Sequence, residues 1–399
     1  MATTTSIEWT RGPDGSPGKT WNPIIGCDRV SPGCDHCYAI STARIREGNP
    51  NPKISAAFAG TAERTEGGVD WTGKVNLLDD RLTQPLRWKK PARVFVNSLS
   101  DLFHDAVPDE FIAQVFAVMA ATPQHTYQVL TKRHGRMRSL LNRPSFRDNL
   151  AHLAAWPLPN VWLGCSVENQ QWADLRIPAL LDTPAAVRFL SCEPLLGPVD
   201  LRAKGCPEAV WDGPYRMRCG LGGDGEECSR HGEFSRLLPD GLHWLIVGGE
   251  SGPQARPMHP DWARSVRDQC EASGTAFFLK QHGEWQPLGP LYGDLEDTDE
   301  GHMEAVHLDV VEGKRVIQLE SSGYIAEGHQ PGDSRTWLMA RVGKKAAGRE
   351  LDGRTHDDFP EPPGSDFQVS VEAGLTEDLA AFSRRLDAAT TKPEEGEHA

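Results

Sequence analysis

The stretch VWLGCSVENQQWADLRIPALLDTPAAVRFLSCEPL (161–195) decides the fold. It opens with a short apolar run that is typical of a buried strand, and helical periodicity follows over 170–184. Another strand-like apolar run begins at Val187. A strand, a helix and a further strand in this order form a βα unit, and repeated units of this kind build a parallel sheet that is buried on both faces.

The same alternation extends in both directions along the chain. Further strands are expected at 93–97, 126–130, 243–247 and 276–281, and further helices at 110–123, 135–141 and 259–274. This pattern predicts an α/β fold, a partial (β/α)6 TIM-like barrel with insertions and a flexible acidic C-terminal tail. In folds of this kind the chemistry takes place at the carboxyl ends of the strands.

The composition divides the chain into three parts. Residues 1–285 are expected to form the barrel, and the glycine-rich segment 202–241 interrupts it as an insertion. Residues 286–360 are expected to form a C-terminal extension that caps the barrel. Residues 361–399 are acidic with few aromatics, so we expect this tail to be largely disordered apart from one helix at 377–389.

Composition also bounds the class of protein. No run of apolar residues is long enough to span a membrane, and the N-terminus lacks the basic and apolar regions of a signal peptide, so we expect a cytoplasmic protein. Nine cysteines, an odd number, argue against a disulfide framework and for metal, cluster or buried thiols. The net charge of −14 does not suit a protein held on nucleic acid by bulk electrostatics.

Three cysteines lie close together in CDRVSPGCDHCY (27–38), where Cys27, Cys34 and Cys37 are spaced C-x6-C-x2-C. A structural zinc site uses C-x2-C as a half-site, but no second close pair follows at finger-like spacing. A thiol redox pair would leave Cys27 unexplained. An iron–sulfur cluster with three thiolate ligands would keep one iron open for a substrate. The residues alone leave these three interpretations open.

The insertion holds a second group of metal-type ligands in C-x12-C-x8-C-x2-H spacing. A glycine-rich loop with little core of its own can fold around zinc, so we treat this group as a second candidate zinc site. The group consists of Cys206, Cys219, Cys228 and His231. The remaining cysteines, Cys165, Cys192 and Cys270, lie in apolar strand or helix contexts and are expected to be small buried hydrophobes.

Polar residues follow each of the predicted strands. Because the carboxyl ends of parallel strands meet at one edge, these residues are expected to line a shared polar mouth. In chain order the candidates are Ser98, Ser100, Asp101, Lys132, Arg133, Ser166, Glu168, Glu193 and Glu250.

Several segments together resemble a phage- and bacterium-associated three-Cys-motif family, related to radical-SAM proteins of the spore photoproduct lyase type. They include TWNPIIGC and PGCDHCYA (within 20–39), FVNSLSDLFH (95–104), VLTKR (129–133), WLGCSVEN (162–169), FLSCEPLLGPVDL (189–201) and WLIVGGESGPQARPMHPDW (244–262). The likeness covers most of residues 6–285, with FFLKQHGEW (277–285) at its end and a short block at 342–360. Most radical-SAM proteins space their cysteines C-x3-C-x2-C, whereas the first gap here is six residues.

The resemblance implies that Cys27, Cys34 and Cys37 ligate three irons of a [4Fe–4S] cluster and that the fourth iron binds S-adenosylmethionine. One electron from the reduced cluster would then cleave the sulfonium to give a 5′-deoxyadenosyl radical, which abstracts hydrogen from a substrate. The resemblance assigns the cofactor to the strand-end candidates named above and to Tyr38, with Asp101 near the amino group and Lys132 near the carboxylate.

The expected function is therefore a radical-SAM enzyme that acts on a nucleic acid base or nucleotide, with a flavodoxin- or ferredoxin-like electron donor and no membrane partner. The alternative is a non-catalytic zinc- or cluster-binding phage-type accessory protein. Iron content and cleavage of S-adenosylmethionine distinguish the two.

Overall fold

A computed structural model describes most of the chain. The described residues are 4–148, 150, 154–202, 241–290, 314–326 and 336–361, with the short pieces 209–211, 217–219, 227–228, 232–233 and 238. Cys206, His231 and the acidic tail beyond residue 361, including the helix expected at 377–389, lie outside the described residues. The side chains of Cys219 and Cys228 are also outside them, so the second candidate zinc site stays a prediction.

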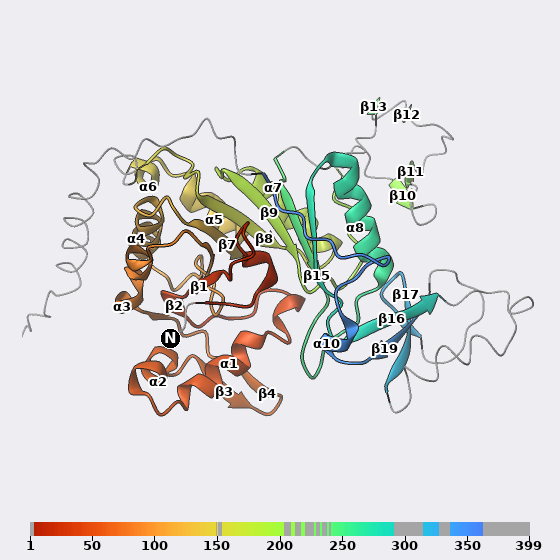
Figure 1. Cartoon of the computed structure of the whole chain (residues 1–399), viewed down its shortest axis with the longest axis horizontal. Coiled ribbons are helices and arrows are strands. Elements are labelled where there is room, and N and C mark those ends of the chain that lie inside the picture. Colours follow the sequence, from red (N-terminus) through yellow and green to blue (C-terminus); the bar gives the residue numbers. More distant parts are fainter. Residues whose placement is uncertain are drawn as a thin grey trace, which may run out of the picture.

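A seven-stranded, fully parallel sheet forms the centre of the molecule and curls around one face (Figure 1). Its strands, in both spatial and chain order, are β1 (Lys19–Trp21), β6 (Arg93–Val96), β7 (Thr126–Thr131), β8 (Val161–Ser166), β9 (Val187–Cys192), β14 (Trp244–Gly248) and β15 (Ala276–Gln281). The predicted α/β class and all the predicted strands are confirmed. The sequence did not indicate β1, because three residues between a glycine-containing turn and Pro23 are too few to show periodicity.

The helices between the strands also match the prediction. They are α4 (Asp109–Ala120), α5 (His134–Leu141), α7 (Gln170–Leu181) and α8 (Pro260–Ser273). The Asn169 side chain caps α7 by accepting from the Trp172 N–H. Gly274 ends α8 with φ of 66°, a left-handed conformation that glycine adopts without steric cost.

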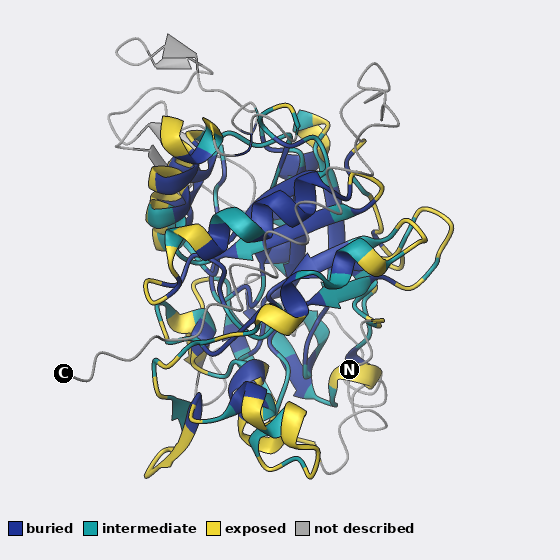
Figure 2. Cartoon of the chain, turned by 90° about the vertical axis from the view of Figure 1, so that its left-hand side faces the viewer, coloured by how far each residue is buried: buried dark blue, intermediate teal, exposed yellow. Residues whose placement is uncertain are grey.

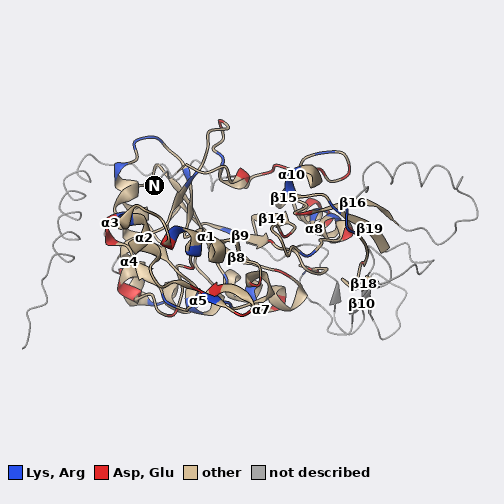
Figure 3. Cartoon of the chain, turned by 90° about the horizontal axis from the view of Figure 1, so that it is seen from below, with Lys and Arg blue, Asp and Glu red and all other residues tan. Residues whose placement is uncertain are grey.

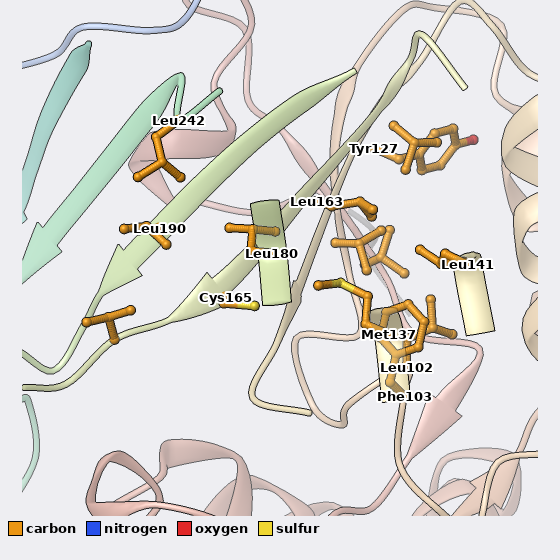
Figure 4. Packing of buried hydrophobic residues seen from close by; sticks show 14 of the residues in the cluster. Leu102, Phe103, Tyr127, Met137, Leu141, Leu163, Cys165, Leu180, Leu190 and Leu242 are labelled. Atoms are coloured by element: carbon orange, nitrogen blue, oxygen red, sulfur yellow. The ribbon is translucent and has the colours of Figure 1, made fainter. Parts of the chain in front are cut away.

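One face of the sheet packs against these helices and forms the larger core. Cys165 of β8 and Leu190 of β9 lie in this layer together with Leu180 of α7, and all three are buried (Figure 4). Figure 2 shows the same division, with buried strands inside and exposed residues on the outer sides of the surrounding helices. Cys165, Cys192 and Cys270 are buried in this layer, which confirms their prediction as small buried hydrophobes.

The opposite, concave face of the sheet has its own apolar cluster. Trp9, from the 3-10 helix η1 (Glu8–Thr10), lies against Phe95, Phe189 and Trp244, at ring-centroid distances of 4.7, 6.4 and 6.3 Å. The Gln128 side chain donates to the Trp9 carbonyl at 3.2 Å and fixes this segment to β7. The N-terminal segment therefore fills the lower part of the concave face, and a cavity opens toward the carboxyl ends of the strands.

Smaller elements surround the sheet. Between β1 and β6 lie β2 (Ile24–Ile25), η2 (Pro32–Cys34), α1 (Tyr38–Glu47), α2 (Pro52–Phe58), β3 (Ala62–Thr65), β4 (Gly68–Trp71), β5 (Asn76–Leu77), α3 (Asp79–Leu82) and η3 (Gln84–Arg87), and α6 (Pro144–Asp148) follows α5. The 202–241 insertion contains β10 (Ala209–Trp211), β11 (Met217–Cys219), β12 (Glu227–Cys228) and β13 (Gly232–Glu233).

The C-terminal extension contributes a four-stranded antiparallel sheet and a short helix. The sheet has the order β16 (Trp285–Pro290), β19 (Thr336–Arg341), β17 (Val316–Glu320) and β18 (Ile325–Ala326), and α10 (Lys344–Ala347) follows it. The chain then runs beside β15, where the Leu279 N–H donates to the His356 carbonyl at 3.0 Å and the Asp358 N–H to the Phe277 carbonyl at 3.2 Å. These bonds cover the edge of the parallel sheet, which would otherwise offer unpaired backbone groups. Within the described ranges, no helix is long and apolar enough to cross a membrane.

We predict that Gly164→Ala destabilises the fold. A Cβ at position 164 of β8 would lie 2.5 Å from the Phe189 ring, which fills the space that the missing side chain leaves. Overpacking of this kind costs about 1–3 kcal/mol, measurable as a lower urea midpoint. Gly135→Ala is the matched control, because a Cβ added to the exposed Gly135 of α5 would have nothing within 4 Å and should keep or slightly raise stability.

Candidate functional site

A cavity of 640 Å³ opens at the carboxyl ends of the parallel strands. Most of the polar residues that the sequence indicated line it: Tyr38, Ser98, Ser100, Asp101, Lys132, Ser166, Glu193 and Glu250. Arg133 and Glu168 do not line it, and hold neighbouring parts of the chain instead. The side chains of Trp9, Phe95 and Leu130 contribute apolar surface to the same cavity. The shared polar mouth is therefore present, with an apolar floor that the sequence did not indicate.

The three clustered cysteines all line this cavity. Cys34 ends η2, Cys37 precedes α1, and the Cys37 N–H donates to the Cys34 carbonyl at 3.4 Å. All three are free thiols. Within the described part of the chain, no three or more His, Cys, Asp or Glu side chains are gathered closely enough to hold a metal ion. The three cysteines therefore line the same cavity without converging on a single point.

Burial changes the acidity of these thiols. Burial, and next the negative charge of Asp101, raise the pKa of Cys27 to about 12. Burial also raises the pKa of Cys37, against the smaller opposing effects of a backbone hydrogen bond and the Lys132 charge. Both thiols are consequently protonated at neutral pH in this structure, and a metal or cluster that binds them must release those protons.

The first attachment of the cysteine loop is at Asp28, next to Cys27. The Arg133 guanidinium forms an ion pair with the Asp28 carboxylate and a second one with Asp105 at 3.3 Å. His104 lies 3.5 Å from the other Asp28 oxygen. Arg133 was one of the strand-end residues expected at the cofactor, and in the structure its guanidinium pairs with Asp28 of the cysteine loop.

The second attachment is at Glu168, which is fully buried after β8. Its carboxylate accepts from the Ser31 hydroxyl at 2.6 Å and from Arg176 of α7 at 2.8 Å, and the Lys132 ammonium lies 3.7 Å away. A Cβ at position 33 would lie 2.5 Å from a Glu168 oxygen. Only glycine at this position therefore lets the loop come so close to the carboxylate. Glu168 thus joins the cysteine loop, β8 and α7.

The third attachment is at Glu250, after β14. Its carboxylate accepts from Arg256 at 2.7 Å and lies 3.0 Å from His36 Nδ1, which is between Cys34 and Cys37. The same Arg256 guanidinium donates to the Pro32 carbonyl at 2.8 Å. Burial by itself would raise the pKa of Glu250, but the hydrogen bonds from Arg256 and His36 outweigh burial and lower it below its ordinary value. Glu250 is therefore ionised at neutral pH and holds the loop on its far side.

Asp101 is also occupied by the protein itself. The Thr131 hydroxyl contacts both of its carboxylate oxygens, at 2.7 and 2.9 Å. The Phe103 and Lys132 backbone N–H groups donate to it at 2.9 and 3.0 Å. That Asp101 binds the amino group of a cofactor stays a prediction. In the structure its carboxylate joins the ends of β6 and β7.

Two lysines with nearby acceptors face the cavity. Lys132 donates to the Ser166 hydroxyl at 3.1 Å. Lys280 lies 2.7 Å from one Glu193 oxygen, and Gln281 donates to the same carboxylate at 3.1 Å. These pairs place two ammonium groups and a hydroxyl group along the rim. The Lys280 charge is balanced by the Glu193 carboxylate.

Sequence reasoning missed several residues of the site. Asp28, Ser31, His36 and Arg256 hold the cysteine loop, and Asn97 lies at the end of β6 on the cavity wall. Their partners lie far along the chain, so neither spacing nor periodicity could have indicated them. For Asn97 the only available signal was its place as the last residue of a predicted strand.

We predict that Glu168→Gln lowers the free energy of unfolding by about 3–5 kcal/mol, because it leaves the fully buried Arg176 charge without its counterion. Asp182→Asn is the control, since the Arg138–Asp182 pair is exposed and its loss should cost at most about 1 kcal/mol. Urea unfolding of the metal-free protein measures both. Equal losses in the two variants would contradict the central role of Glu168.

We predict that Arg256→Ala exposes the cysteine loop. The variant removes the guanidinium bonds to Glu250 and to the Pro32 carbonyl, so the buried Cys34 thiol should react several-fold faster with a thiol reagent in the native protein. Cys270, buried on the other side of the sheet, reports global unfolding and should not react faster. Arg354→Ala, which removes only an exposed ion pair with Glu271, is the control variant.

No curated protein and no solved structure matches the chain. One family model matches residues 4–360, which include the cysteine loop, the parallel sheet and the C-terminal extension. The chain therefore belongs to the family described as "Protein of unknown function (DUF5131)".

Proposed function

We propose that the protein is a radical-SAM-type enzyme whose active site is the cavity at the carboxyl ends of the parallel strands. The observation that supports this most is the meeting of Cys27, Cys34 and Cys37 with the polar ends of the strands in one cavity. The proposal includes the finer fold assignment, in which the curled sheet is an incomplete TIM-like barrel. In barrels of that kind the active site lies at the same end of the strands.

The donor set suits a [4Fe–4S] cluster in type and number. Three thiols would serve three irons, which leaves one iron for S-adenosylmethionine. The described cysteines outside the loop, Cys165, Cys192 and Cys270, are buried on the helix-covered side of the sheet and do not line the cavity. Cys27, Cys34 and Cys37 would hold the cluster, and the loop that carries them is attached to the rest of the site at Asp28, Ser31 and His36.

When bound, the cluster and S-adenosylmethionine supply one-electron cleavage of the sulfonium and so a 5′-deoxyadenosyl radical. The residues of the chain bind, orient and exclude water. Trp9, Phe95 and Leu130 form an apolar floor that keeps water from the lower part of the cavity. Lys132 and Ser166 provide a cation and a hydroxyl for the carboxylate and ribose groups of the cofactor. Glu193 and Lys280 also line the cavity, where they would contact a substrate.

For the substrate and partners we propose a nucleic acid base or nucleotide, and a flavodoxin- or ferredoxin-like reductant in the cytoplasm. Lys344 of α10 supports an anionic substrate, because it lines the cavity and its exposed side chain has no hydrogen-bond or ion-pair partner among the described residues. Lys344 belongs to the C-terminal extension and lines the cavity, which supports a role of this extension at the site. The free thiols of the loop suit a reducing compartment.

We predict that Cys34→Ala abolishes iron binding and S-adenosylmethionine cleavage. The wild-type protein, reconstituted without oxygen, should hold about four irons per chain and, once reduced, form 5′-deoxyadenosine. Cys165→Ala is the matched control, because it also removes a buried thiol, and it should keep full iron content and activity.

Two results would contradict the proposal. A colourless wild-type protein with stoichiometric zinc at the three cysteines would instead support a metal-binding accessory protein. Equal iron content in Cys34→Ala and in the wild type would show that the loop does not ligate the cluster.

A further inference from the structure

Asn97 is a buried side chain with no hydrogen bond. It follows β6 on the cavity wall and is 3% exposed. Neither the oxygen nor the nitrogen of its amide has a partner. Gln128 and Gln281, the other buried amides near the concave face, each have an unpartnered oxygen but donate through their nitrogen. A buried polar group without a partner is costly, so the Asn97 amide calls for an explanation.

The backbone conformation does not provide that explanation. Asn97 has φ of 58°, in the left-handed region that asparagine tolerates better than most residues. Glycine adopts the same conformation more easily and carries no amide to bury. The turn is already fixed by other bonds, from the Asn97 N–H to the Trp21 carbonyl at 2.8 Å and from the Ser100 N–H to the Asn97 carbonyl at 3.3 Å. The positive φ would explain a glycine at position 97. It does not explain why the residue is an asparagine whose amide is buried without a partner.

The cavity beside Asn97 suits a flat ring. Phe95, two residues earlier on β6, lines the cavity with Trp9, and their ring centroids are 4.7 Å apart. Aromatic side chains of this kind favour stacking or edge contacts with heterocycles. The volume of 640 Å³ is within the usual range for pockets that hold small molecules and cofactors.

We infer that the Asn97 amide recognises the edge of a nucleobase in this cavity. An asparagine amide offers one donor and one acceptor side by side, which matches the neighbouring acceptor and donor of an adenine edge. Because neither amide atom has a partner in the ligand-free structure, rotation of the amide toward the cavity breaks no hydrogen bond. The inference shares its cavity with the proposed function and names the ligand class. The base belongs either to the adenosyl cofactor or to a nucleotide substrate.

The test measures nucleoside binding to the metal-free, full-length protein by equilibrium dialysis, with adenosine, guanosine, cytidine and uridine as probes. The wild type should bind adenosine most tightly. Asn97→Gly should weaken adenosine binding by about tenfold or more, because both hydrogen bonds to the base are lost. Asn97→Asp keeps the size of the side chain but loses the donor, so it should weaken adenosine binding as well.

Two controls separate recognition from folding. Asn97→Gly should unfold at the same or a higher urea concentration than the wild type, because it removes a buried unpaired amide at a positive φ. Asn142→Gly replaces an exposed asparagine at the end of α5, away from the cavity, and should leave adenosine binding unchanged.

Competition with S-adenosylmethionine identifies the source of the base. Displacement of adenosine assigns the subsite to the cofactor, and simultaneous binding assigns it to the substrate. Equal adenosine affinities in the wild type and Asn97→Gly, or no nucleoside binding by the wild type, would overturn the inference. Iron content is measured separately, so a protein that binds adenosine through Asn97 but holds no cluster would contradict only the proposed function.

Discussion

The buried carboxylate of Glu168 is the interaction on which the site depends. It accepts from Ser31 of the cysteine loop and from Arg176 of α7, and it lies beside Lys132 after β7. A carboxylate with no exposed surface is stable as an anion only if its partners stay in place, because an unpaired buried charge costs several kcal/mol. This one side chain therefore joins the loop, the helix and two strand ends, and Asp28 and Glu250 attach the loop at two further points.

The position of the cavity follows from how polarity changes along the strands. On the concave face the starts and middles of the strands carry large apolar side chains, including Phe189, Trp244 and Phe278, and Trp9 packs among them. The last inward-facing positions are smaller or polar, such as Ser166, Ser191 and Lys280. The large apolar side chains pack closely and leave no room for a ligand. The smaller or polar side chains at the strand ends do not fill the space beside them. The cavity consequently lies at the end of the sheet where the cysteine loop is attached.

Charge is balanced locally in spite of the overall net charge of −14. Around the cavity, Glu168, Glu193 and Glu250 are each paired with a cationic side chain. Across the described part of the chain, Lys and Arg lie among Asp and Glu on the face that Figure 3 shows. Recognition of an anionic ligand would therefore rest on a few groups at the mouth, among them Lys344, and not on the field of the whole protein.

The sequence by itself determined the α/β class, the six strands that show periodicity, the helices between them and the gathering of polar strand ends at one mouth. These features come from patterns within short windows, which reflect local burial. Only the tertiary structure decided that Trp9 fills the concave face, that β1 joins the sheet, that Asn97 is left unpaired and that Arg133 holds the loop instead of lining the cavity. Ser31 and Glu168 are 137 residues apart, and His36 and Glu250 are 214 apart. Local sequence patterns do not indicate such pairs, because nothing in the neighbouring residues of either partner specifies the other.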